Sequence, residues 1–307
     1  MTATPRVLSL GAGVQSTALL LLSAEGVIPR YDAAIFADTG WEPAAVYQHL
    51  DRIDRDIAGP AGIPILRVSN GNIRDDALDS GHRFASMPLF VRNPDGTGGL
   101  ARRQCTNEYK LKPIKAAVRA VLGAKERADG KAGRAPKGRY VHQSIGISTD
   151  EFERAKDADV SYARNVFPLL DLGMSRNDCR RYLTAAGLED TPKSACIGCP
   201  FSGNSRWRTM RDEAPKEFAD AVAFDHAIRH GGAGANAKGK TLRGTAYLHR
   251  SMVPLDKAPI DRVTRGEWKD RQVDLFDAVA DQLMEDGDPD GCSPWACRSG
   301  APIDEAK

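Results

Sequence analysis

Two cysteines and a turn of small residues are the groups in this sequence whose types and spacing could do chemistry. Cys196 and Cys199 place two thiols on one short segment, which suits chelation of a soft metal. Residues 9–17, SLGAGVQST, join an apolar segment to a helical one. Small residues let backbone N–H groups approach an anion, and a helix N-terminus adds partial positive charge. The cysteines therefore predict a metal or thiol site, and the turn predicts a phosphate site.

The identity of the phosphate ligand is open at this point. Gly11, Gly13 and Ser16 imitate the spacing of the dinucleotide fingerprint, and Asp38 ends the next apolar segment about where a ribose-binding acid would stand. The third glycine of that fingerprint is missing, and so is the lysine of a Walker loop. The competing interpretation is a PP-loop, which holds the phosphates of ATP. A tight turn without any ligand is the remaining alternative.

Four later segments, taken in order with the glycine loop, resemble the phosphoadenosine phosphosulfate (PAPS) reductase family of PP-loop proteins. They are FADTGWEP at residues 36–43, RQCT at 103–106, GISTDEFER at 146–154 and SACIGCPF at 194–201. Gly11, Ala12 and Gln15 depart from the general PP-loop pattern, which has Ser, Gly and Asp at these places. Because that acid is lost, Asp38 becomes the candidate for holding magnesium.

The resemblance implies an ATP pyrophosphatase with ATP and Mg²⁺ as ligands. It assigns catalysis to Asp38 and Arg154 and substrate binding to Arg103 and Arg154, whose planar guanidinium groups suit a phosphate or sulfate. A salt bridge from Arg154 to Asp150 or Glu151 within its own helix is the competing interpretation. The nucleotide-binding residues implied are Leu10, Gly11, Ala12, Gly13, Gln15, Ser16, Thr17, Phe36 and Asp38.

The same resemblance brings Cys105 next to the Cys196 and Cys199 pair. Three cysteines around a 4Fe–4S cluster would leave one iron open to sulfide or a substrate sulfur, as in related enzymes that thiolate tRNA. A fourth ligand could come from Cys292 or Cys297 in the segment GCSPWAC, although a nucleophilic thiol or two reduced thiols in a tail are the alternatives there. A zinc site with two further ligands competes with the cluster.

The function expected from this set is ATP-dependent sulfur transfer. The enzyme would adenylate an acceptor, release pyrophosphate and then insert sulfur, with DNA or tRNA as the acceptor and a cysteine desulfurase or another protein as sulfur donor. A PAPS or adenylylsulfate reductase that uses Cys292 or Cys297 is one alternative. A non-catalytic, zinc-stabilised nucleotide-binding module is another, and a dehydrogenase leaves the cysteines unexplained.

Composition narrows the class of protein. The 307 residues are 41% apolar and 27% charged, with a net charge of +2, which excludes a strongly basic nucleic-acid coat protein. The only basic stretch to test is residues 125–139, KERADGKAGRAPKGR, interpreted first as a solvated loop and second as a phosphate-contacting flap. No apolar run reaches membrane-spanning length, and the polar residues within 7–24 disfavour a signal peptide. We therefore expect a cytoplasmic protein without membrane partners, with homo-oligomers allowed.

These residues require strands and helices that alternate. Strands are predicted at residues 6–10, 32–37, 63–68 and 140–147, and helices from about residue 16, at 44–57 and at 109–122. This alternation predicts an α/β fold, with a parallel, twisted, Rossmann-like sheet covered by helices on both faces. Residues 1–170 would form the nucleotide-binding domain, and residues 171–307 a mostly helical region. Helices are predicted there at 176–186, 204–212, 215–229 and 268–285, with Cys179 in the core and a loop at 231–240.

Overall fold

The computed structural model describes residues 4–82, 87–128, 130, 132–239, 241–265, 267 and 268. The chain forms two compact units, and each unit is built from separate stretches of sequence. Among the described residues, the sheet unit holds residues up to 70 and 107–194, and the cysteine unit holds 71–106 and 195–268. This division differs from the expected boundary after residue 170. The reason is that residues 171–194 pack on the sheet, where Cys179 and Leu183 join its core.

The sheet unit is built on five parallel strands. They are β1 (Arg6–Leu10), β2 (Ala33–Asp38), β3 (Ile65–Ser69), β6 (Val141–Ser144) and β7 (Ala163–Val166), in the order β3-β2-β1-β6-β7. The predicted α/β class with a Rossmann-like parallel sheet is confirmed. The four predicted strands are present, and β7 was not predicted. The strand order reverses between β1 and β6, and the crevice outside the carboxyl ends of strands at such a reversal is where open α/β sheets bind ligands.

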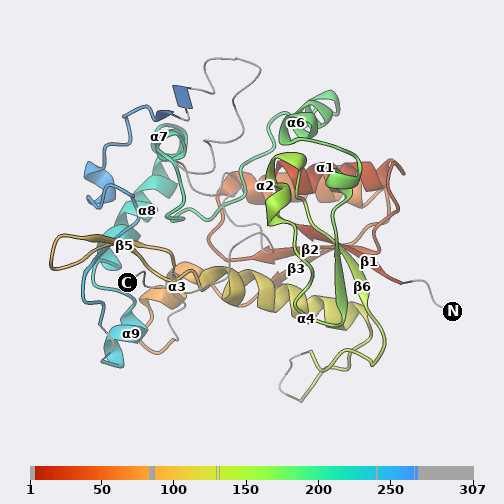
Figure 1. The fold of residues 1–307 in the computed structure, drawn as a ribbon, viewed down its shortest axis with the longest axis horizontal. Coiled ribbons are helices and arrows are strands. Elements are labelled where there is room, and N and C mark those ends of the chain that lie inside the picture. Colours follow the sequence, from red (N-terminus) through yellow and green to blue (C-terminus); the bar gives the residue numbers. More distant parts are fainter. Residues whose placement is uncertain are drawn as a thin grey trace. The chain divides into compact units, whose positions relative to one another are not determined.

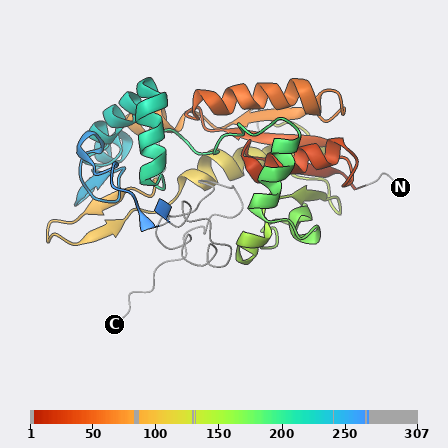
Figure 2. The same cartoon turned by 90° about the horizontal axis from the view of Figure 1, so that it is seen from above.

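Helices cover both faces of this sheet, as expected for a parallel sheet (Figure 1). One face carries α1 (Val14–Ala24), α2 (Ala44–Ile53), α5 (Pro168–Asp171) and α6 (Arg176–Ala185). The other face carries α4 (Lys112–Val121). Figure 2 shows α1 (red) and α2 (orange) running alongside each other. π-helical turns at Asp54–Ala58 and Thr106–Leu111 adjoin α2 and α4, and a 3₁₀ segment spans Thr149–Arg154.

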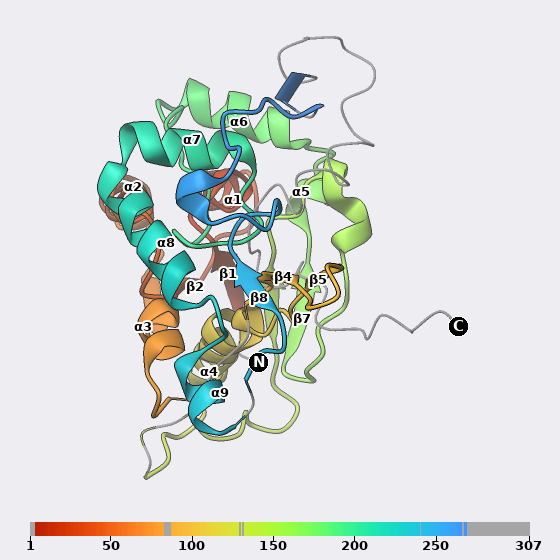
Figure 3. The ribbon, with the colours of Figure 1, turned by 90° about the vertical axis from the view of Figure 1, so that its left-hand side faces the viewer.

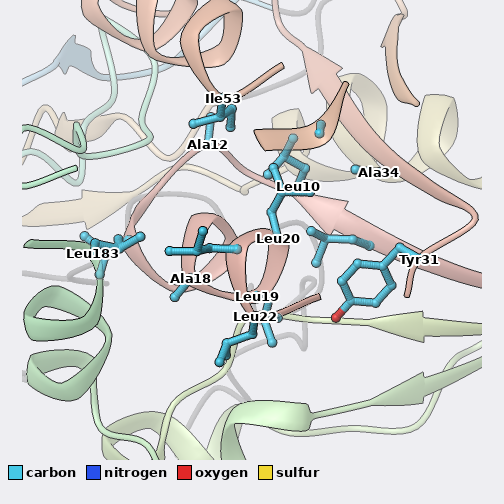
Figure 4. Close-up of a cluster of buried hydrophobic side chains, with 14 of the residues drawn as sticks. Leu10, Ala12, Ala18, Leu19, Leu20, Leu22, Tyr31, Ala34, Ile53 and Leu183 are labelled. Carbon is cyan, nitrogen blue, oxygen red and sulfur yellow. The ribbon is translucent and has the colours of Figure 1, made fainter. Parts of the chain in front are cut away.

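The core of the sheet unit explains the leucine run near the N-terminus. Helix α1 is buried from Val14 to Ser23, because it lies between the sheet and the helices on the same face. Leu19, Leu20 and Leu22 pack there with Tyr31 and Leu183 (Figure 4). Burying a leucine side chain contributes about 1.5–3 kcal/mol, so this run anchors the helix that begins at the glycine loop.

The cysteine unit has a different architecture. Its sheet has three short antiparallel strands in the order β5-β4-β8 (Figure 3), with β4 at Phe90–Arg92, β5 at Gly98–Leu100 and β8 at Thr245–Tyr247. Its helices are α3 (Ile73–Leu78), α7 (Asn204–Glu213), α8 (Pro215–Ala227) and α9 (Ala233–Ala237), with a 3₁₀ turn at Leu255–Lys257. Helices α7 and α8 were predicted. Helix α9 lies where a loop was expected, and the predicted helix at 268–285 lies outside the described residues after Trp268.

The buried carboxylate of Asp225 ties the cysteine unit together. It pairs with Arg229 and accepts backbone N–H groups from Leu248 (2.7 Å) and Leu255 (3.0 Å). A buried charge is tolerated when it is paired and hydrogen-bonded in this way. Within the described part of the chain, no helix has both the length and the apolar character needed to cross a bilayer.

Candidate functional site

The glycine loop follows β1 at the carboxyl edge of the sheet, next to the reversal of strand order. Its conformation is set by Ser16, whose hydroxyl accepts the backbone N–H groups of Gly11 (3.2 Å) and Gly13 (3.3 Å). The same hydroxyl donates to the carbonyl of Gly13 (3.2 Å). Ala12 has a φ of 57°, which side-chain-bearing residues rarely adopt and which over-determined functional turns often hold. The side chain of Ser16 thus folds the loop over the start of α1.

Two glycines allow other backbone segments to approach this loop closely. A Cβ on Gly146 would lie 3.0 Å from the backbone nitrogen of Ser16, and a Cβ on Gly13 would lie 3.3 Å from the Cβ of Ser194. The segment after β6 and the segment that ends at Ser194 therefore both border the loop. In the sequence, Gly146 and Ser194 are only the first residues of two motifs. Their position next to the glycine loop is visible only in the structure.

Several of the predicted nucleotide-binding side chains point into the protein core. Leu10 and Phe36 belong to the main core cluster, so only their backbone atoms could face a ligand. The hydroxyl of Thr17 is buried and lies 3.1 Å from Nε2 of His49. Burial lowers the pKa of His49 to about 4, so this histidine is neutral at pH 7. Gln15 and Ser16 are also buried, which leaves the backbone of residues 11–13 as the part of the loop suited to phosphate.

Asp38 stands at the end of β2, at the same carboxyl edge. Its Oδ1 accepts the hydroxyl of Tyr47 (2.7 Å) and the N–H of Gly40 (2.8 Å), which has a φ of 71°. Burial, together with the hydrogen bond and charge of Asp38, raises the pKa of Tyr47 above its ordinary value, so Tyr47 remains a donor. Asp38 is therefore held in one orientation by two donors at the predicted position.

A buried ion pair lies beside this turn, and the sequence did not single it out as a site. Nζ of Lys110 is 3.6 Å from Oε1 of Glu42, and these side chains are 6% and 1% exposed. The hydroxyl of Thr39 donates to the same carboxylate (3.0 Å). Glu42 was visible in the sequence as a member of the segment at 36–43, and Lys110 follows the RQCT segment. Their pairing depends on the π-helical turn before α4, which brings Lys110 to the residues after β2.

Arg154 is engaged inside the sheet unit. Its Nη1 lies 2.8 Å from Oε2 of Glu151, and both side chains are largely buried. The neighbouring Asp150 accepts the backbone N–H of Arg176 (2.5 Å) at the start of α6. The structure thus shows the competing interpretation of Arg154, a salt bridge to its own segment. The predicted role of Arg154 in substrate binding stays a prediction.

The three predicted cluster cysteines all belong to the cysteine unit, and all are buried. Cys196 and Cys199 lie on one turn, closed by a backbone bond from the N–H of Cys199 to the carbonyl of Cys196 (3.2 Å). Arg206 donates to the carbonyl of Cys196 (3.0 Å) and to that of Ala195 (2.7 Å). The turn is therefore anchored from α7. Cys179 is fully buried in the core of the sheet unit, so its predicted core role is confirmed.

Arg103 and Thr106 flank the region of Cys105. The guanidinium of Arg103 lies 4.9 Å from the centre of the Phe201 ring, a cation–π contact within the cysteine unit. Thr106 is buried, and its hydroxyl has no hydrogen-bond partner within the described part of the chain. The contact between Arg103 and Phe201 brings the segment around Cys105 and the segment after Cys199 together.

Within the described part of the chain, Cys105, Cys196 and Cys199 do not form a metal-binding group as they are placed. Among the described residues, no three His, Cys, Asp or Glu side chains come together as a metal-binding group. Cys292 and Cys297, the candidates for a fourth ligand, lie outside the described residues. The donor chemistry suits a soft metal, but the placement does not establish a cluster.

No protein-family model matches the chain, and no curated protein sequence matches it either.

Proposed function

We propose that this protein is an ATP pyrophosphatase that activates an acceptor by adenylation for sulfur transfer. The observation that supports the proposal most is the glycine loop. It lies at the carboxyl edge of a parallel sheet, at the reversal of strand order, and two further backbone segments pack against it. Two features favour ATP over a dinucleotide as the ligand of this loop. The later segments resemble those of the PAPS reductase family, and the third glycine of the dinucleotide fingerprint is missing.

The loop suits a phosphate chain for two physical reasons. The N–H groups of Gly11 and Gly13 point at one acceptor, at present the hydroxyl of Ser16, so they are arranged to bind a single oxygen. Gly13 is the N-cap of helix α1 and offers no capping side chain, and the N-terminus of this helix favours negative charge. The Ser16 hydroxyl would keep these N–H groups convergent while they bind a phosphate oxygen of ATP.

In the proposed reaction, an oxygen of the acceptor attacks the α-phosphate of ATP. The new bond joins that oxygen to phosphorus, and the bond to the bridging oxygen breaks, so pyrophosphate leaves. A sulfur nucleophile then displaces AMP from the activated carbon or phosphorus. Asp38 would hold Mg²⁺, which uses one or two carboxylates together with substrate phosphates and does not need a cluster of acids. The N–H groups of the loop would stabilise the developing phosphate charge.

The sulfur step carries a separate prediction about Cys105, Cys196 and Cys199. We keep a 4Fe–4S cluster on these residues as the proposal, with zinc as the alternative. No reaction step is assigned to it, because the described residues do not assemble three ligands. The acceptor proposed is a nucleic acid, and the sulfur donor is a cysteine desulfurase or an equivalent protein.

The test of adenylation is ATP–pyrophosphate exchange with DNA, tRNA and a buffer blank as acceptors. Exchange that depends on one nucleic acid is expected, and it should fall strongly in Ser16→Ala and Asp38→Asn. Ser80→Ala, at an exposed serine of the cysteine unit, is the matched control and should exchange normally. The proposal would be contradicted if no acceptor supported exchange. It would also be contradicted if neither Ser16→Ala nor Asp38→Asn lowered the exchange rate.

The test of the cluster is independent of the first. Anaerobically purified protein is expected to be brown and to contain iron and acid-labile sulfide. The variant Cys196→Ser should lose both, whereas Cys179→Ala should keep them, because Cys179 lies in the core of the sheet unit. Zinc without iron would favour the zinc alternative. Sulfite formation from PAPS that depends on Cys292 or Cys297 would favour the reductase.

A further inference from the structure

A second candidate site lies at the opposite, amino edge of the same sheet. A cavity of about 1060 Å³ opens there, between the chain that links α4 to β6 and the residues before β7. It is lined by six cationic side chains, Arg119, Arg127, Arg134, Lys137, Arg139 and Arg164. We call this cavity the basic groove. The glycine loop follows the carboxyl end of β1, so the groove is not part of the proposed ATP site.

The groove concentrates positive charge in a protein with little of it overall. The chain has 43 basic and 41 acidic residues, yet none of the described residues that line the groove is acidic. Arg134, Lys137, Arg139 and Arg164 are exposed, and no ion pair within the described part of the chain involves them. Uncompensated cations that share one concave surface repel each other, and a bound anion relieves this repulsion.

Two of the cations are held in place by tyrosines. The guanidinium of Arg164 lies 4.0 Å from the ring centre of Tyr140. Arg119 lies 5.9 Å from the ring of Tyr162, and its Nη1 is 3.2 Å from that hydroxyl. Nη2 of Arg119 also reaches the carbonyl of Ala132 (3.4 Å), which ties the linking chain to α4. Stacking restricts a guanidinium without using all its donors, so these groups stay able to bind an anion.

From this arrangement we propose that the basic groove binds the phosphate backbone of a nucleic acid. Five of the six cations are arginines, whose planar forks match phosphate oxygens in pairs. The cations are spread along an open cavity larger than a typical small-molecule pocket of about 300–1000 Å³, so the surface fits an extended polyanion better than one phosphate. Contacts to phosphate carry no base code, so binding is expected to be independent of sequence and weakened by salt.

This inference deepens the proposed nucleic-acid acceptor but does not require adenylation. Binding is measured without ATP, whereas the proposed function is measured by pyrophosphate exchange. A protein that binds oligonucleotide and shows no exchange would keep the groove and lose the function. A protein that exchanges without binding through the groove would do the reverse.

The experiment measures fluorescence anisotropy of labelled oligodeoxythymidine and oligouridine with the full-length protein, between about 50 and about 200 mM salt. The test variant combines Arg134→Gln, Lys137→Gln and Arg139→Gln. The matched control combines Lys216→Gln, Lys238→Gln and Lys257→Gln, three exposed lysines of the cysteine unit that remove the same charge. Because all six side chains are exposed, both variants should fold, which circular dichroism and thermal unfolding check.

The test variant is expected to bind at least about tenfold more weakly at low salt, and its slope of log affinity against log salt should be shallower by about 2. The control should bind as the unmodified protein does. Equal loss in the two variants, or none in the test variant, would overturn the proposal. So would inorganic phosphate at millimolar level displacing the oligonucleotide completely, which indicates a small-anion site, or polyglutamate binding in preference, which indicates an acidic protein partner.

Discussion

The two edges of the parallel sheet differ in whether their charged side chains are paired. At the carboxyl edge, Asp38, Glu42 and Lys110 are hydrogen-bonded or paired, and the glycine loop is closed by Ser16. At the amino edge, Arg134, Lys137, Arg139 and Arg164 of the basic groove are exposed, and none of the described lining residues is acidic. The first arrangement depends on contacts between individual atoms. The second depends on summed charge, so single changes at the two edges should differ in size.

The largest effect is expected from removing the buried cation at the carboxyl edge. Lys110→Met leaves the carboxylate of Glu42 buried without its cation, and the free energy of unfolding should fall by about 3–5 kcal/mol. Chemical denaturation measures the change. Lys112→Met is the matched control, because Lys112 is half exposed in its pair with Glu108 and should cost less than about 1 kcal/mol. Equal losses in the two variants would show that the pair is not buried as described.

A Cβ added at the carboxyl edge should cost less stability but more activity. Gly146→Ala places a methyl group 3.0 Å from the backbone nitrogen of Ser16, so the loop must move. We expect about 1–3 kcal/mol of lost stability and about a hundredfold loss of ATP-dependent exchange. At the amino edge, Gly26→Ala, between α1 and β2, meets open space at a φ of 77° and should cost about 1 kcal/mol without any loss of exchange. Similar exchange in both variants would argue against a role for the loop.

Acid should weaken the sheet unit through His49, behind the glycine loop. The folded protein holds the pKa of His49 at about 4, below its ordinary 6.5, so the unfolded state binds the proton more readily. The free energy of unfolding should therefore fall as the pH drops from about 6.5 and level off below about 4. His249 in the cysteine unit is lowered in the same way, so His49→Gln should remove only part of the slope. An unchanged slope in that variant would contradict the burial of His49.

The smallest effect on stability is expected at the amino edge. Arg134→Gln removes one exposed cation, and the free energy of unfolding should change by no more than about 0.5 kcal/mol. Thermal unfolding in low and high salt checks this. A loss comparable to that of Lys110→Met would mean that the groove is a structural network, and the contrast between the two edges would disappear.

The strands and helices around the core could be predicted because their buried positions are apolar residues that recur at the spacing of a strand or a helix. Strands β1, β2, β3 and β6 and helices α6, α7 and α8 all lie close to their expected residues. Strands β4, β5 and β8 were missed because three residues are too few to show alternation. Helix α1 begins at Val14, two residues before the expected start, since Ser16 closes the loop from within the first turn.

For the sites, residue type and spacing predicted the glycine loop, the cysteine turn and the core role of Cys179. The pairing of Arg154 with Glu151 was foreseen as an alternative, but residue type and spacing could not predict that Thr17 faces His49 or that Glu42 meets Lys110 across 68 positions, from 42 to 110. Each of these depends on which face a side chain presents after packing. Local sequence does not specify that face when several polar residues lie together.

By itself, then, the sequence determined an α/β chain with a glycine-containing loop after the first strand and two thiols on one turn. Chain geometry and hydrophobic periodicity are local properties, and they are readable before folding. Only the tertiary structure decided the interleaved units and the buried pair beside Asp38. It also decided that six cations from residues 119–164 gather on one open surface at the amino edge. Those features join residues that are far apart in the chain. Neighbouring parallel strands are linked by long crossover connections, so residues that meet at one edge of the sheet are well separated in sequence.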